Sequence, residues 1–438
     1  MAVLLRLNQG GTTYSLVSGD VMVTEGYTPR VGAVGDPTVV DSIPLLLFGA
    51  TAAAVQAVAW AIERHLVAAR KRQADQAGTR VYLEMWLDAD SEYWRSEILD
   101  GRLTFAEGAL DTQSTRKVEA VLLLERVNFW ESGEGELAIS NKISSAATGG
   151  RTIGNHTDGD AAASSGNWGQ VAAGQVGGSL PTPALITLAN ATASSQDYRN
   201  IYIGLNAYSD PVNFAHMIEG EAAAPSYGTS VSLSSCSGGA YLSKTVTGSS
   251  FIQWTLPAAT MQAAQGRFFR LLARLASISG SCYLRPVVRD STGLVDLFVG
   301  DERLVSSEVA LVDLGALPLP PSVGAVSWGD LTLLLMVRSV AGVTLGLDFV
   351  QLTPADSFAQ VRQRGLSIPA GGVITLDGIE GAVYGGGSPI YTPIQMPLWL
   401  QPNLLQRIYV LHDEGTGAPV ITNTFTVRVY YRKRRLTL

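Results

Sequence analysis

The residues that could perform acid-base or metal chemistry are few and scattered. The 438-residue chain has four histidines, His65, His156, His216 and His412. None of them stands in an HExxH or other metal-ligand spacing, which would place two ligands on one face of a helix. His216 has a carboxylate three residues further on, in Glu219, but a loop histidine held by local hydrogen bonds explains the same pattern. His65 falls within a helical pattern, where we expect it at the surface or in an interface.

Catalytic motifs are equally sparse. A glycosidase needs two carboxylates that face each other across a cleft. The sequence offers six candidates without pairing any of them: Asp210, Glu219, Asp290, Asp296, Asp301 and Asp348. It contains no G-x-S-x-G elbow, no P-loop and no dinucleotide fingerprint, and Gly385-Gly386-Gly387 lacks the strand-to-helix context of a phosphate loop. We therefore predict that the chain is not an enzyme and has no catalytic, metal-binding or cofactor-binding residues.

Sugar binding is a further possibility. Sugars stack an apolar ring face on an aromatic side chain, while amides and carboxylates take the hydroxyl groups. The aromatic candidates are Tyr198, Tyr202, Tyr208, Tyr227, Tyr241 and Trp254. Tyr202 and Trp254 stand within strand-like patterns, where a position in the core explains them equally well. The sequence therefore names no glycan site.

The composition favours an assembly protein. Only 16% of the residues are charged, against about 25% in ordinary soluble domains. A surface with few charges is one that neighbouring subunits can cover, although a β-rich extracellular protein with Gly/Ser loops has the same composition. The net charge of -7 gives no sign of a specific nucleic-acid partner. The basic run at residues 432–435 is interpreted as a solvated strand end or a salt-bridge patch between subunits.

Neither a disulfide framework nor a membrane span is expected. Cys236 and Cys282 are the only cysteines, so they either pair within one domain or remain free buried thiols. Residues 1–7 are too short for a secretory signal. Residues 43–62 carry no charge over a length that could span a bilayer, but their apolar positions recur with the period of an amphipathic helix.

That period predicts one helix, from about residue 51 to residue 73. Its apolar stripe consists of Val55, Val58, Ile62, Leu66 and Ala69, which recur at the spacing of one helical face. Thr51 is the expected N-cap, because its hydroxyl can accept a free backbone N–H of the first turn. The basic residues 70–72 suit the C-terminal end of the helix dipole.

Strand-like segments surround this helix and define an N-terminal unit, residues 1–131. They cover residues 3–7, 12–17, 21–23, 80–87, 93–99, 102–105 and 117–126. The Asp100-Gly101 pair between two such runs predicts a hairpin. Several strands packed on one helix make a compact α+β unit.

The composition changes after residue 131. Residues 132–180 are rich in Ser, Ala, Gly, Asn and Thr, which predicts a linker or an arm that crosses to a neighbour. Residues 181–354 contain short strands with turns between them, which predicts a β-sandwich. Its last strand, Leu347 to Leu352, resembles the closing strand of carbohydrate-binding jelly rolls. Strict alternation would place Leu347, Phe349 and Gln351 on one face of that strand.

The last segment, residues 355–438, is short for an independent core. Alternation in its final strand places Phe425, Val427, Val429 and Tyr431 on one face. A Pro402-Asn403 break between strand-like runs, followed by this strand, resembles the closing segment of phage distal tail (Dit) proteins. The strands around one helix in residues 1–131 likewise resemble the tail-tube and distal-tail fold. The resemblance implies that residues 355–438 complete the N-terminal unit around an inserted jelly roll; three consecutive domains are the alternative.

The predicted fold class is mainly β: a tail-hub-like β-sandwich with one packed helix, plus an inserted jelly-roll β-sandwich. The resemblance implies a structural virion protein, a distal-tail or hub component in the tail of a phage or tail-like particle. Such a protein assembles with itself into a ring, usually sixfold, contacts other tail proteins and could contact host glycans. The alternative is a secreted glycan-binding module or a glycoside-hydrolase accessory protein, and ring formation distinguishes the two.

Overall fold

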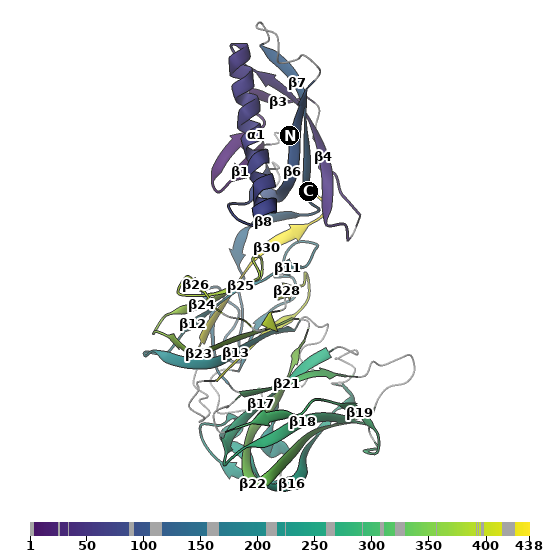
Figure 1. Ribbon diagram of the computed structural model, residues 1–438, viewed down its shortest axis with the longest axis vertical. Coiled ribbons are helices and arrows are strands. Elements are labelled where there is room, and N and C mark those ends of the chain that lie inside the picture. Colours follow the sequence, from purple (N-terminus) through teal and green to yellow (C-terminus); the bar gives the residue numbers. More distant parts are fainter. Residues whose placement is uncertain are drawn as a thin grey trace. The chain divides into compact units, whose positions relative to one another are not determined.

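The computed structural model describes residues 4–24, 27–33, 35–86, 92–105, 116–155, 166–206, 217–223, 225–259, 268–290, 292–306, 311–319, 329–355, 357–390, 392, 394–395, 398–413 and 425–438. The chain divides into two compact units (Figure 1). The first, here called the terminal unit, comprises Met1–Glu134, Gly178–Leu180 and Arg432–Leu438. The second comprises Gly135–Gly177 and Pro181–Tyr431.

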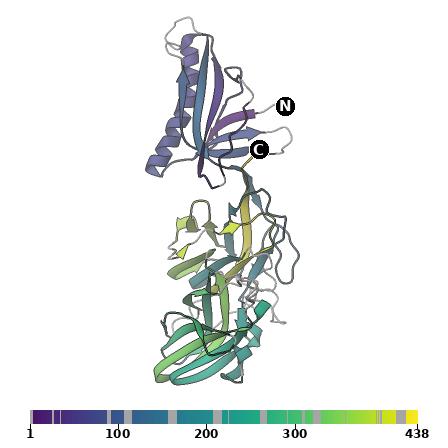
Figure 2. The ribbon, with the colours of Figure 1, turned by 90° about the vertical axis from the view of Figure 1, so that its right-hand side faces the viewer.

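The terminal unit is a β-sandwich with one helix packed on it (Figures 1 and 2). Its elements are β1 (Leu4–Gln9), β2 (Thr12–Ser15), β3 (Val21–Val23), β4 (Thr38–Phe48), α1 (Ala52–Asp75), β5 (Val81–Trp86), β6 (Trp94–Phe105), β7 (Lys117–Val127) and β8 (Trp130–Glu136). One sheet has the order β2-β1-β5-β6-β8 and is continued by the end of β30 (Phe425–Arg435). The other contains β3, β4, β7 and the second half of β6. A mainly β chain with one α-helix among its described residues confirms the expected fold class.

Helix α1 forms where the sequence predicts it. The Thr51 hydroxyl accepts the Ala54 N–H at 3.2 Å, and the helix ends where Gln76 adopts a left-handed conformation. The predicted apolar stripe is buried in the core of the terminal unit. His65, which we expected at the surface, is buried as well, with Nδ1 2.9 Å from the carbonyl oxygen of Ala61. It lies three residues after Ile62, on the same helical face.

The uncharged run at residues 43–62 belongs to two elements. Residues 43–48 end strand β4, and residues 52–62 begin helix α1. Among the helices that the structure describes, none is long and apolar enough to cross a membrane.

The hairpin expected at Asp100-Gly101 is wrong. Strand β6 runs through both residues, pairs with β5 before them and with β7 after them, and carries a bulge between Ile98 and Asp100. Gly101 provides space: a Cβ there would lie 2.9 Å from Leu124 Cδ2 and 3.0 Å from Leu66 Cδ2. The glycine lets α1 approach the strand, a role that its sequence context does not distinguish from a turn.

The second unit contains one β-sandwich nested within another. The carrier sandwich, built from residues 135–206 and 357–431, has strands β9 (Arg151–Ile153), β10 (Trp168–Val171), β11 (Thr182–Pro183), β12 (Leu185–Asn190), β13 (Gln196–Asn206), β23 (Phe358–Ile368), β24 (Val373–Asp377), β25 (Ala382–Gly385), β26 (Ser388–Pro389), β27 (Ile394–Gln395), β28 (Trp399–Leu400), β29 (Gln406–Asp413) and most of β30.

The inserted sandwich, residues 217–355, leaves the carrier after β13 and returns at β23. Its elements are β14 (Met217–Glu219), η1 (Gly220–Ala223), β15 (Thr229–Ser232), η2 (Ser237–Gly239), β16 (Ala240–Leu256), β17 (Phe268–Ile278), β18 (Cys282–Arg289), β19 (Asp296–Val299), β20 (Arg303–Val305), β21 (Leu311–Pro318) and β22 (Leu331–Pro354). The entry and exit strands are paired neighbours, with Gly204 opposite Phe358. The insertion therefore replaces the turn of a β-hairpin.

Residues 132–180 differ from the linker or arm that composition suggests. They contribute β9 and β10 and bury Ile139 and Val171 in the core of the carrier sandwich. The apolar residues of this segment are sparse, but several of them occupy buried positions. Composition averaged over the segment conceals that pattern.

The C-terminal segment also differs from its expected place. Residues 425–430 pair with Leu185–Asn190 of β12, so they close the carrier sandwich, and only Arg432–Leu438 join the terminal unit. Strands β12 and β13, expected in the domain at residues 181–354, belong to the carrier as well. The physical reason is register. Pairing with β12 puts Phe425, Val427 and Val429 on the same side of the sheet as the buried apolar residues of β12.

Two long strands run through both layers of the inserted sandwich. Strands β16 and β22 pair along most of their length and change register near Gly248 and Gly342, whose φ angles of 83° and 77° suit glycine. The first half of β22 pairs with β16 and β18, and the second half with β16 and β17. One β-ribbon thus supplies strands to both layers of the inserted sandwich.

We predict that an aspartate at position 62 unfolds the terminal unit. Ile62 is fully buried, and an unpaired carboxylate there should cost several kcal/mol. Val31→Asp is the control, because Val31 belongs to the same unit and is 48% exposed. Hydrogen exchange on α1 and β6 should show lost protection in Ile62→Asp only. Equal protection in the two variants would contradict the packing of the helix.

Candidate functional site

The inserted sandwich holds a cluster of acidic groups where η2 contacts β22. The Ser237 backbone N–H donates to Asp348 Oδ1 at 2.9 Å, and the Ser237 hydroxyl donates to Glu219 Oε1 at 3.0 Å. Gly238 lies against a third carboxylate, because a Cβ there would stand 2.8 Å from Glu221 Oε1. Three carboxylates therefore converge on one short segment.

A β-bulge and one arginine make this arrangement possible. Arg274 of β17 pairs with Phe349, whereas Leu275 pairs with Leu347, so Asp348 is the extra residue of a bulge. Arg274 Nη1 lies 3.1 Å from Asp348 Oδ2, and both side chains are buried. Burial raises the pKa of Asp348 to about 8; Arg274 opposes this shift, and the charge of Glu219 adds to it.

The bulge also corrects the expected faces of this strand. Leu347, Val350 and Leu352 face the core of the inserted sandwich. Phe349 lies on the other side, in a small cluster with residues of the carrier sandwich that includes Tyr202 and Phe358. Strict alternation grouped Leu347 with Phe349, and the extra residue separates them.

The contacts of this cluster are those of a structural support. Asp348 is held by Arg274 and the Ser237 backbone N–H, and Glu219 is held by the Ser237 hydroxyl. Within the described ranges, no group of three or more His, Cys, Asp or Glu side chains is arranged to hold a metal ion. The pKa values of the two cysteines are raised by burial, to about 12 for Cys236 and about 11 for Cys282, and both thiols are free.

The other residues considered for acid-base chemistry do not join this cluster. Asp290 is held within its own turn by Thr292 and backbone N–H groups, and Asp296 pairs with Arg289. Asp301 is exposed. His412 is buried in the carrier sandwich beside Tyr198. Asp210, His156, His216 and Tyr208 lie outside the described residues.

Most of the aromatic residues considered for glycan binding are core residues. Tyr198 and Tyr202 are buried in the carrier sandwich, and Trp254 is buried in the inserted one, where its Nε1–H donates to the carbonyl oxygen of Glu219. Tyr227 and Tyr241 are half-buried. Tyr227 packs against Phe251, with ring centroids 5.5 Å apart, and Phe251 is 37% exposed.

Phe251 belongs to the outward face of one sheet of the inserted sandwich. Cross-strand partners share a face, so Phe251 is joined there by Met336 and Arg285. The next row carries Arg338, which covers the Tyr283 ring at 4.3 Å and forms an ion pair with Glu302 at 2.7 Å. This face, here called the Phe251 face, combines aromatic rings with polar groups.

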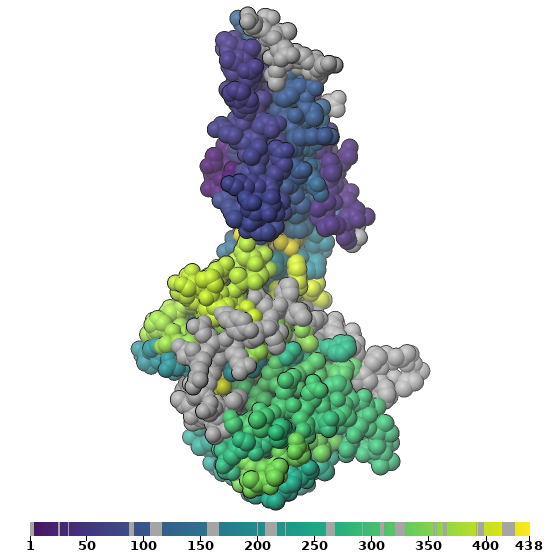
Figure 3. Space-filling model, in the orientation of Figure 1, coloured from purple at the N-terminus to yellow at the C-terminus, as the bar shows by residue number. Residues whose placement is uncertain are grey.

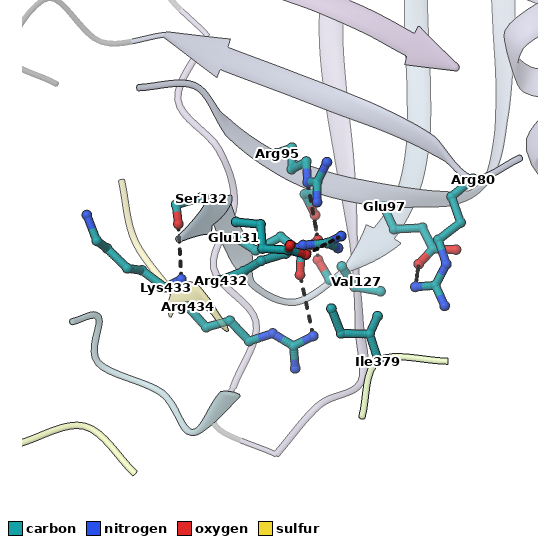
Figure 4. A network of polar contacts seen from close by, with 12 residues as sticks. Arg80, Arg95, Glu97, Val127, Glu131, Ser132, Ile379, Arg432, Lys433 and Arg434 are labelled. Atoms are coloured by element: carbon teal, nitrogen blue, oxygen red, sulfur yellow. Dashed lines mark hydrogen bonds and ion pairs between the residues drawn. The ribbon is translucent and has the colours of Figure 1, made fainter. Parts of the chain in front are cut away.

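The basic C-terminus forms a further polar cluster, in the terminal unit (Figure 4). Glu131 is 5% exposed and accepts hydrogen bonds from three arginines: Arg432 Nη1 at 3.0 Å, Arg95 Nε at 3.3 Å and Arg434 Nη2 at 3.4 Å. The Lys433 backbone N–H donates to the Ser132 hydroxyl at 3.0 Å. The run at residues 432–435, expected as a solvated end or a patch between subunits, is therefore engaged within its own chain.

Neither polar cluster was found from the sequence. The spacing of Arg432 and Arg434 was the available signal, because side chains two apart on a strand share a face and a nearby acid stabilises two like charges placed there. Glu131 stands next to Trp130 without any local pattern that marks it. Glu221 and Arg274 are likewise ordinary in the sequence. A bulge sets Asp348 beside Arg274, and Glu221 comes from η1.

Comparisons with known proteins leave the family open. No family model matches the chain, and no curated protein matches its sequence. Among solved structures, a GH26-CBM35 beta-(1,4)-mannanase from Podospora anserina is 18% identical with a TM-score of 0.23, covering 34% of this chain and 28% of the mannanase chain.

A phage baseplate gives a longer alignment. A chain of the phage P2 baseplate in its activated conformation with Ca is 12% identical with a TM-score of 0.20, covering 77% of this chain and 99% of that one. The same baseplate with Sr gives 11% identity and a TM-score of 0.20. All these TM-scores lie below 0.5, so they decide neither the fold nor the function.

We predict that Glu131→Gln loosens the terminal unit. The change keeps the shape of the side chain but leaves three partly buried guanidinium groups without their shared negative charge, which should cost about 3 kcal/mol. Hydrogen exchange on β8 and β6 reports the loss. Glu92→Gln is the control, because Glu92 pairs with the exposed Lys433 and should cost less than about 1 kcal/mol. Similar losses in both variants would contradict a special role for Glu131.

Proposed function

We propose that this chain is a structural component of a phage tail or tail-like particle, acting as a distal-tail or hub protein without enzymatic activity. In this role the terminal unit assembles with other copies into a ring, the other partners are tail proteins, and the chain is located in the virion. The order of the ring is expected to be sixfold, as the resemblance in the sequence implies.

One observation carries this proposal: apart from the short segment Gly178–Leu180, the chain leaves the terminal unit after residue 134 and returns to it at residue 432. The last strand of the chain completes a β-sandwich with one helix, and a β-rich insertion lies between the N-terminal and C-terminal segments of that sandwich. This is the arrangement that the closing segment of distal tail proteins implies, although less of the C-terminus takes part than we expected. The insertion begins and ends at β8 and β30, which are neighbours in one sheet.

The surface of the terminal unit supports assembly. Several large apolar side chains there are about half exposed, namely Met22, Val40, Trp60 and Val67. Exposed apolar area of this kind marks sites of protein contact when it is contiguous. The low charge content of the chain points in the same direction.

The proposal predicts that the purified chain forms a closed ring. Sedimentation velocity at rising concentration should show one discrete oligomer, and electron microscopy of that species should show a ring. An interface of stable assemblies buries roughly 1,200–2,000 Å² in total, so the oligomer should persist at micromolar concentration. A monomer at high concentration would contradict the hub function.

A second role, glycan contact by the inserted sandwich, is favoured by the Phe251 face. Aromatic side chains beside arginine and carboxylate groups are what sugar recognition requires. The same face would serve a virion protein that touches a host surface, or a secreted glycan-binding module, which is the alternative identity of the chain. Oligomeric state separates these two identities, and sugar binding does not.

We expect Phe251→Ala to reduce glycan binding at least about tenfold, because one stacking contact of this kind is worth about 1.5 kcal/mol. A glycan array selects the ligand, and calorimetry with the selected sugar measures the change. Phe268→Ala is the control: Phe268 is 61% exposed in the same sandwich but lies on another strand, outside the Phe251 face. Absence of any sugar ligand, or equal losses in both variants, would refute this second role.

A further inference from the structure

The outer face of α1 carries an exposed tryptophan. Ala53, Ala57, Trp60, Arg64, Val67 and Lys71 are all exposed and follow the helical spacing of a single face. Trp60 is 66% exposed and Val67 is 52% exposed. The resulting stripe is apolar at Ala53, Ala57, Trp60 and Val67 and basic at Arg64 and Lys71. Figure 3 shows the segment of α1 at the surface of the terminal unit. It runs for about 27 Å, at 1.5 Å per residue.

A groove of about 630 Å³ lies on the sheet that contains β4 and β7. Its lining includes Thr24, Pro44, Thr104, Phe105, Glu119 and Val121. Leu45 and Ala120 also border the groove, but their side chains, which alternate with those of Pro44 and Val121 along the strands, face the core of the terminal unit. The side chains of Pro44, Glu119 and Val121 therefore point away from that core.

These two surfaces belong to opposite sides of the terminal unit. Helix α1 packs its buried face on the core side of the sheet, whereas the groove opens on the other side of it. Figure 1 shows α1 and β4 on opposite sides of the unit. A contact between two different, opposed surfaces is the head-to-tail type that builds rings.

The chemistry of the two surfaces is complementary. Trp60 and Arg64 are one helical turn apart, about 6 Å along the axis, and Val121 and Glu119 are about 6.8 Å apart along the strand. An indole placed over Val121 and Pro44 would therefore bring the guanidinium beside the carboxylate. Both charged groups are exposed, so the pairing requires no burial of an isolated charge.

We infer that the α1 face of one copy docks in the β4–β7 groove of the next copy, with Trp60 in the groove and Arg64 paired with Glu119. The inference rests on the proposed ring and specifies its interface. The apolar contact supplies affinity, and the charge pair fixes the register and orientation of neighbouring copies.

Charge reversal on the full chain tests this pairing. Arg64→Glu and Glu119→Arg should each raise the concentration at half-assembly by at least about tenfold, because like charges then meet at the contact. The double variant should assemble as the wild type does. An equimolar mixture of the two single variants should also form rings, since the reversed helix of one meets the reversed groove of the other. Arg70→Glu is the control, because Arg70 is exposed on α1 outside the stripe, and its assembly should not change.

The outcomes separate the interface from the ring itself. A wild-type monomer would overturn both the hub proposal and this interface. Wild-type rings with unaffected single variants would overturn the interface alone. Disrupted single variants without rescue by the double variant or the mixture would show that Arg64 and Glu119 do not meet. Rescue in the mixture also excludes misfolding as the cause of the single defects, because a misfolded chain would not regain assembly.

Discussion

The terminal unit depends on one buried carboxylate that three arginines share. Glu131 stands at the point where β8 leads out of the unit, and Arg432 and Arg434 stand where β30 leads back into it. Glu131 can contact these arginines only when the whole chain between them allows the two strands to meet. Burying Glu131 costs free energy unless its oxygens are satisfied, so the carboxylate favours the state in which the C-terminal strand is in place. The same contact therefore fixes where the insertion begins and ends.

This design makes the insertion nearly independent of the unit that carries it. The free-energy cost of closing a loop grows only with the logarithm of its length, so a folded excursion between neighbouring strands costs little more than a long loop. The chain uses the device twice, since the inserted sandwich leaves the carrier between β13 and β23, which are also paired. The inserted sandwich and the carrier sandwich can then each change surface residues without disturbing the strand pair from which they branch.

The sequence predicts the local structure better than the assignment of strands to domains. The stripe of Val55, Val58, Ile62 and Leu66 and the cap at Thr51 locate α1 within two residues at each end, because both signals lie within one segment. The partner of Phe425 is instead decided by which distant apolar face matches its register, and β12 is more than 230 residues away. The acidic cluster could not be predicted for a related reason. The bulge at Asp348 adds one residue to a strand, so the alternation of side chains between the two faces is inverted beyond it.

In the proposed assembly, the distribution of charge would help surfaces of the terminal unit to meet. Charged residues are scarce, and some lie inside: Arg126 and Asp41 form a buried ion pair at 2.5 Å, and Glu131 holds three arginines within the unit. Each such pair removes charges that would otherwise keep neighbouring copies apart. A stripe with Trp60 at its centre then needs only one exposed cation to select its orientation, since apolar contacts alone allow several. A head-to-tail contact closes into a ring only at a fixed rotation, so orientation, more than affinity, decides between a ring and an open fibre.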